Sequence, residues 1–272
     1  MDPAAGPRYR YPPALVAQVG WSLLCGRWRP FAPDATRLCQ TLRPPARVEG
    51  REHIPLSGSL VAVFNHYHSP TLPAWWGPIA ITAAVHARRP TDTNGCRWVM
   101  TNAWTYPDPL RQRLLTPLTR WAFGRLARLY GFFAMPPMPP RPQEVEPRAR
   151  VVRQVLAAAR QPQPPLIGLS PEGHDSPDAS LLVPPPGVGR FLLHLAGSGL
   201  PLLPVGVFES EGQLIVRFGP PFNLRPPPGL TPQGRDGWAS RQVMLAIGRE
   251  LPPQLWGAYR DSLSTPPAQP PP

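Results

Sequence analysis

Short apolar runs without charge recur along the chain and are separated by longer segments with helical spacing. Two of them, 59–64 and 166–170, have the length of strands that are buried on both faces of a sheet. Further strands are predicted at 97–101, 202–208 and 213–218, and the last two are joined by the turn residues 210–212. Helices are predicted at 14–25, 108–130, 145–161, 187–196 and 238–251.

Strands that alternate with helices indicate an α/β fold class, with a mixed, mostly parallel central sheet flanked by helices and an N-terminal helical segment. We divide the chain into an N-terminal disordered and helical segment (1–44), an α/β domain (45–261) and a Pro-rich tail (262–272). Residues 1–12 and 262–272 are rich in Pro, which predicts disorder. Hydrophobic residues make up 42% of the 272, enough to form the core of one domain.

Polar residues follow the two central apolar runs. His66 comes directly after the first, and Glu172 after the second. In open α/β sheets, ligands bind at the carboxyl ends of the strands. Histidine can accept a proton near neutral pH, and a carboxylate is the usual partner that orients it. This pattern predicts a site that activates a hydroxyl group.

Five sequence blocks, in order, resemble the glycerolipid acyltransferase superfamily, which includes lysophosphatidate acyltransferases. The similarity covers roughly residues 45–260. The blocks are Val48–Pro55, Asn65-His66, Pro171-Glu172-Gly173, Pro201–Val207 and Leu251–Tyr259.

The resemblance implies transfer of a fatty acyl group from acyl-CoA or acyl-ACP to a hydroxyl of a lipid-like acceptor. It implies no metal and no cofactor besides that thioester co-substrate. His66 is then the general base. The expected substrate-binding residues are Asn65, Pro171, Glu172, Gly173, His174 and, from a middle block at 131–136, Gly131.

Three positions depart from the family pattern. The Asp expected after His66 falls at Thr71, the Thr-Arg expected after Gly173 falls at His174-Asp175, and the middle block lacks its closing Arg. We therefore take His66, Thr71 and Asp175 as catalytic candidates.

These departures leave three alternatives. Asp175 or Asp178 replaces the lost acid, or the enzyme is slow or uses a different acceptor, or the chain binds lipid without catalysis. An acceptor phosphate beside Asp175 would be repelled, so the acceptor either lacks a phosphate or binds it differently.

The net charge of +12 and pI of about 11.0 are typical of proteins that bind nucleic acid or an anionic membrane. All 28 basic residues are Arg, and there are 45 Pro, so much of this charge reflects biased composition. No nucleic-acid-binding fingerprint accompanies it, and we expect no nucleic-acid partner.

Two segments favour a membrane surface. The segment 14–25 is apolar with Arg and Trp nearby, and 108–130 combines apolar positions with five Arg and no acid after Asp108. Pro117 is expected to break the second helix. Packing on the core alone is the other interpretation of both. With no apolar run of 18 residues, we expect peripheral or monotopic association at the cytoplasmic face of a membrane.

The three cysteines, Cys25, Cys39 and Cys96, show neither a CxxC pair nor metal-ligand spacing. We interpret them as inert thiols in a reducing compartment.

Overall fold

The computed structural model describes residues 6–139 and 141–265. Its helices are α1 (Pro13–Cys25), α2 (Phe31–Cys39), α3 (Trp76–Arg88), α4 (Pro109–Tyr130), α5 (Val145–Ala159), α6 (Val188–Ala196), α7 (Pro232–Arg249) and α8 (Arg260–Ser264). Its strands are β1 (Arg47–Glu49), β2 (Val61–Phe64), β3 (Cys96–Thr101), β4 (Phe133–Met135), β5 (Leu166–Leu169), β6 (Leu202–Ser210) and β7 (Gln213–Phe218). Short 3-10 turns lie at η1 (Arg51–His53), η2 (Pro142–Glu144), η3 (Pro253–Leu255) and η4 (Gly257–Tyr259).

The strands form one seven-stranded sheet in the order β1-β7-β6-β2-β5-β3-β4. Only β6 and β7, the predicted hairpin, run antiparallel among the described strands; the other neighbouring pairs are parallel. The predicted α/β class with a mostly parallel sheet is therefore confirmed. Because β2 and β5 are parallel neighbours, with Val63 opposite Leu169, the residues that follow them meet at one edge of the sheet.

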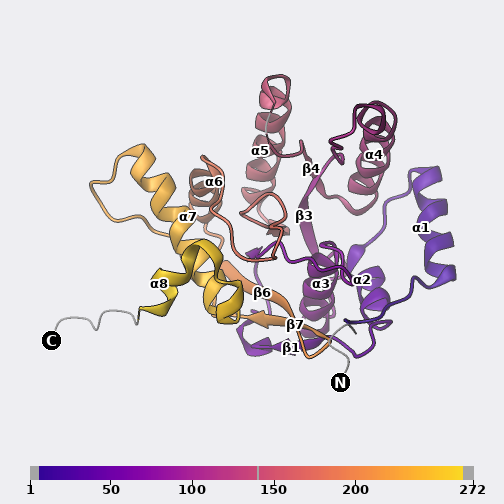
Figure 1. The fold of residues 1–272 in the computed structure, drawn as a ribbon, viewed down its shortest axis with the longest axis horizontal. Coiled ribbons are helices and arrows are strands. Elements are labelled where there is room, and N and C mark those ends of the chain that lie inside the picture. Colours follow the sequence, from indigo (N-terminus) through magenta and orange to yellow (C-terminus); the bar gives the residue numbers. More distant parts are fainter. Residues whose placement is uncertain (1–5, 140, 266–272) are drawn as a thin grey trace.

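Each face of the sheet has its own core because successive side chains of a strand point to opposite faces. On β2, Ala62 and Phe64 face the core covered by α2, α3 and α4, with α1 packed beside α4. Val61 and Val63 face the core covered by α5, α6 and α7. Figure 1 shows these two groups of helices on either side of the sheet.

Helix α4 continues through Pro117 as one helix, so the predicted break was wrong. Proline removes one backbone donor and leaves the carbonyl of residue i−4, here Arg113, without its helical partner. Arg113 is exposed, so water can bond that carbonyl. Helices α2 and α8 and the short strands β1 and β4 were not predicted, and α7 begins six residues earlier than expected.

Residues 6–12 are held against the domain, which corrects the prediction of disorder for this part. Arg8 and Arg43 exchange backbone hydrogen bonds of 2.9 and 2.8 Å, and the ring of Tyr9 packs on Trp76. Residues 262–264 belong to α8, Thr265 follows this helix, and residues 1–5 and 266–272 lie outside the described part of the chain. None of the described helices is both long enough and apolar enough to span a bilayer.

Candidate active site

The candidate site lies at the carboxyl edge of the sheet, where the loops after β2 and β5 meet. His66 is the second residue after β2, and Glu172 is the third after β5. The backbone N–H of His66 donates to Oε1 of Glu172 at 2.8 Å. The two residues predicted from separate apolar runs are therefore adjacent.

Asp175 supplies the carboxylate nearest to the His66 ring. Its Oδ1 lies 2.5 Å from Nδ1 of His66, and the two side chains are 53% and 28% exposed. The oxygen is not aligned with the direction of an Nδ1–H bond. The contact is therefore a close approach of two polar atoms and not a linear hydrogen bond. This contact with His66 lowers the pKa of the Asp175 carboxyl, and partial burial opposes the shift.

Glu172 is a buried support for His66. Its side chain is buried, and its second oxygen, Oε2, accepts the backbone N–H of Leu182 at 2.8 Å. Burial raises the pKa of the Glu172 carboxyl, although the two N–H donors oppose this. Glu172 thus ties the loop after β2 to the loop after β5.

Asn65 clamps the end of β2 to β6. Its Nδ2 donates to the carbonyl of Val207 at 2.8 Å, and its Oδ1 accepts the Val207 N–H at 2.7 Å. The side chain is buried and both ends of its amide are engaged. Asn65 therefore positions His66 and does not present its amide to a substrate, which differs from the predicted binding role.

Thr71 does not take the place of the carboxylate beside His66. Its hydroxyl lies 3.1 Å from Oγ of Ser69 and donates to Oε2 of Glu209 at 3.4 Å. Ser69 also donates to Glu209, at 2.5 Å. Gly6 covers this group closely, since a Cβ there would meet the Thr71 hydroxyl. Thr71 belongs to a polar cluster around Glu209.

The predicted binding residues after β5 are only partly accessible. Pro171 is buried, whereas Gly173 and His174 are exposed. Gly173 has φ +72°, a conformation that favours glycine, and lies beside Met138 of the loop after β4. Nδ1 of His174 lies 3.0 Å from the carbonyl oxygen of Glu172.

Asp178, the other acid predicted to replace the lost Asp, is hydrogen-bonded to residues close to it in the sequence. Its Oδ1 accepts hydrogen bonds from the hydroxyls of Ser176 and Ser180 and from the Ser180 N–H. These bonds lower the pKa of Asp178 to about 2. Of the two acids proposed from the sequence, Asp175 is the one that contacts the His66 ring.

Gly131 does not belong to this edge, which corrects its predicted role in substrate binding. Gly131 caps α4 with φ +69° and lies two residues before the first residue of β4. The amino end of a parallel strand lies at the edge opposite to His66. The carbonyl oxygen of Gly131 accepts a hydrogen bond of 2.6 Å from Nε of Arg97.

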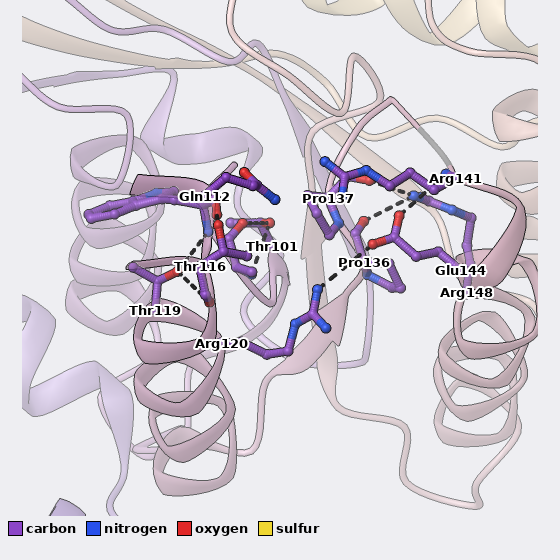
Figure 2. Close-up of polar contacts among 12 residues, drawn as sticks. Thr101, Gln112, Thr116, Thr119, Arg120, Pro136, Pro137, Arg141, Glu144 and Arg148 are labelled. Atoms are coloured by element: carbon purple, nitrogen blue, oxygen red, sulfur yellow. Dashed lines mark hydrogen bonds and ion pairs between the residues drawn. The ribbon is translucent and has the colours of Figure 1, made fainter. Parts of the chain in front are cut away.

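Polar contacts hold the loop that follows β4, next to the site (Figure 2). Nη2 of Arg148 donates to the carbonyls of Pro136 and Pro137 at 3.0 and 2.9 Å, and burial lowers the pKa of Arg148. Arg120 of α4 extends toward Glu144, with 3.9 Å between Nη2 and Oε1. The guanidinium of Arg148 thus shapes the loop after β4.

Sequence reasoning missed the residues whose role depends on tertiary contacts. Glu209 and Val207 lie on β6, and Leu182 contributes only a backbone N–H. No local motif marks these positions. Within the described part of the chain, no group of three or more His, Cys, Asp or Glu side chains could hold a metal ion.

No known protein-family model matches this chain, and no curated protein sequence does. The fold is similar to the crystal structure of the 1-acyl-sn-glycerophosphate (LPA) acyltransferase PlsC from Thermotoga maritima. The TM-score is 0.51, with 15% sequence identity over 86% of this chain and 89% of that chain. At this identity the similarity establishes an acyltransferase-like fold, in agreement with the sequence resemblance.

Proposed function

We propose that the chain is an O-acyltransferase that moves a fatty acyl group from acyl-CoA or acyl-ACP to a hydroxyl of a lipid-like acceptor. The observation that carries this proposal is the pair formed by His66 and Asp175 at the carboxyl edge. An acyltransferase-like fold and the Asn65-His66 block support it. The proposal needs no cofactor besides the thioester.

In this mechanism His66 takes the proton of the acceptor hydroxyl on Nε2, since Nδ1 faces Asp175. The hydroxyl oxygen forms a bond to the thioester carbonyl carbon, and the carbonyl becomes a tetrahedral oxyanion. The C–S bond then breaks, and the proton on His66 passes to the departing thiolate. The products are an ester and a free thiol.

Asp175 acts as the positioning carboxylate. A carboxylate at Nδ1 fixes the ring tautomer and stabilises the imidazolium that forms during the reaction. Catalytic hydrogen bonds are often poorly aligned before substrate binds. We expect the His66 ring and Asp175 to align when the acceptor enters.

The direct test is release of free thiol from acyl-CoA by the purified protein in the presence of lysophosphatidate, monoacylglycerol or a long-chain polyol. We expect release that depends on one class of acceptor, together with the ester product. Binding of acyl-CoA or lysolipid without release would favour the alternative function, a lipid-binding relative that does not catalyse.

We further propose that the protein associates peripherally with an anionic membrane surface at its cytoplasmic face. Most of the large exposed apolar side chains lie on α1 and α4 or just beside them. They are Tyr11, Val16, Trp21, Leu24, Trp28, Trp104, Leu110, Leu114, Leu115, Leu118 and Trp121. Trp75, at the start of α3, is also exposed and donates a hydrogen bond to the Tyr11 hydroxyl. An exposed apolar surface with Trp and Arg suits the interface of a membrane.

A further inference from the structure

A cavity of about 210 Å³ lies between α1 and α4. Its lining residues are Ser22, Leu23, Gly26, Arg125, Arg128 and Leu129. Helix α4 ends near the amino end of β4, so the cavity lies toward the edge of the sheet opposite to His66. Its volume is many times what one water molecule requires.

The side chain of Arg125 lines this cavity, and part of its hydrogen-bonding capacity has no partner among the described residues. Its Nη1 donates to the carbonyl of Leu23 at 3.3 Å, and its Cζ lies 5.8 Å from the centre of the Trp121 ring. Its Nε is covered and has no acceptor among the described residues. Arg128 is exposed, and within the described structure it forms no ion pair.

The partial negative charge at the carboxyl end of α1 balances only part of the positive charge of Arg125 and Arg128. The carboxyl end of a helix carries about half a negative charge, whereas the cavity has two full positive charges. Residues 13–33 and 109–143 contain no Asp or Glu. The acids next to these segments are already engaged: Asp34 with Arg29, Glu144 with Arg120, and Asp108 with the backbone N–H of Arg111 as the N-cap of α4. The cavity therefore has an excess of positive charge that suits an anion.

The surface of α4 leads from apolar residues to this basic cavity. Leu110, Leu114, Leu118 and Trp121 are exposed. At 3.6 residues per turn, these four side chains and the two arginines fall within a stripe about 80° wide. Leu114 and Arg125 are separated by about 16 Å along the helix axis, roughly half the thickness of a bilayer core.

We propose that the cavity between α1 and α4 binds the phosphate of an anionic phospholipid headgroup while the apolar stripe of α4 contacts the acyl chains. Two guanidinium groups can bond phosphate oxygens with charge-assisted hydrogen bonds. This inference rests on the membrane association proposed above and is independent of catalysis by His66.

The test compares co-sedimentation of the full chain with phosphatidylcholine vesicles that contain or lack phosphatidylglycerol. The variants are R125Q/R128Q and a control, R111Q/R113Q, which removes the same charge from exposed positions of the same helix. R128Q alone and R125K/R128K complete the set, because R125Q also removes the contact with Leu23.

We expect R125Q/R128Q to bind phosphatidylglycerol vesicles at least about fivefold more weakly than the control, a difference beyond the loss of diffuse attraction common to both. R128Q should also bind more weakly than the wild type. R125K/R128K should be weaker as well, since Lys keeps the charge but loses the planar fork. Glycerol phosphate in solution should compete only weakly, because it lacks the acyl chains.

Equal losses in R125Q/R128Q and the control, with full binding by the Lys variant, would show diffuse attraction and overturn the headgroup site while leaving membrane association intact. Strong competition by glycerol phosphate would assign the cavity to a soluble phosphate ligand instead. Absence of vesicle binding by the wild-type protein would overturn both membrane proposals, and the thiol-release assay would still judge the acyltransferase proposal separately.

Discussion

Oδ1 of Asp175 lies 2.5 Å from Nδ1 of His66, although the two residues follow different strands of the sheet. The carboxylate on His66 thus comes from the Pro-Glu-Gly loop after β5. The position where the sequence resemblance expects an Asp holds Thr71, which contacts Glu209 instead. This arrangement makes Thr71 and Asp175 separable by mutation.

Restoring an acid at Thr71 is expected to give no gain in activity. A carboxylate there would lie close to the Glu209 carboxylate, which now accepts a hydrogen bond from Thr71. Like charges at this exposed position should lower the free energy of unfolding by roughly 0.5–1 kcal/mol. Thermal unfolding and thiol release of T71D are compared with T71N, which has a similar size and no charge. A faster T71D enzyme would show that His66 lacks its acid in the native protein.

Removing the charge of Glu172 should destabilise the domain. In E172Q one acceptor oxygen becomes an NH₂ group that faces either the His66 N–H or the Leu182 N–H, both of which now donate to Glu172. A buried donor left without an acceptor costs about 1–3 kcal/mol. Denaturant unfolding measures the loss, and E146Q, at an exposed carboxylate on α5, is the control. Equal stability of the two variants would contradict the supporting role of Glu172.

The pair of His66 and Asp175 predicts a specific acid dependence of stability. The pKa of Asp175 is lower in the folded protein than its ordinary value, so its stabilising contribution is present above the unfolded pKa and is lost as pH falls through the folded pKa. The difference in stability between wild type and D175N should therefore shrink below about pH 4. Solvent screens this half-exposed pair, so the difference is small. The pKa of Glu172 is raised in the folded protein, so its contribution to the pH dependence of stability has the opposite sign to that of Asp175. Because Glu172 is present in both proteins, this contribution cancels to first order when wild type and D175N are compared. A difference that is independent of pH would contradict the pair.

Membrane association should depend on charge. Binding to vesicles is expected to rise with the content of anionic lipid and to fall with added salt, because ions screen the attraction between Arg and lipid phosphates. Vesicle co-sedimentation over a range of salt concentrations measures this. W21A, at an exposed position of α1, should weaken binding even at high salt, since it removes apolar contact. Binding that ignores both lipid charge and salt would remove the electrostatic part of the proposal.

The sequence predicted the parts of the fold that are encoded locally. The runs that became β2 and β5 contain only uncharged and mostly apolar residues, and the hairpin of β6 and β7 has Glu211-Gly212 at its turn. Strand β4, with three residues, pairs with β3 and packs under α5, so its existence depends on neighbours that no local pattern reveals.

The candidate site was predictable to the same extent. His66 and Glu172 follow predicted strands, and a parallel sheet brings such ends together. The choice between Asp175, Asp178 and Thr71 depends on loop geometry within a few ångströms, which residue types cannot specify. The support given by Val207 and Glu209 to the loop after β2 comes from β6, far away in sequence.

The central claim is that His66 and Asp175 act together in acyl transfer, and the rate of thiol release from acyl-CoA with an accepted alcohol tests it most directly. We predict that H66A removes turnover and that D175N lowers it by on the order of 10³–10⁴, as for the acid of a serine protease triad. H194A, at an exposed position of α6, should keep the wild-type rate. Wild-type turnover in folded H66A or D175N would contradict the account.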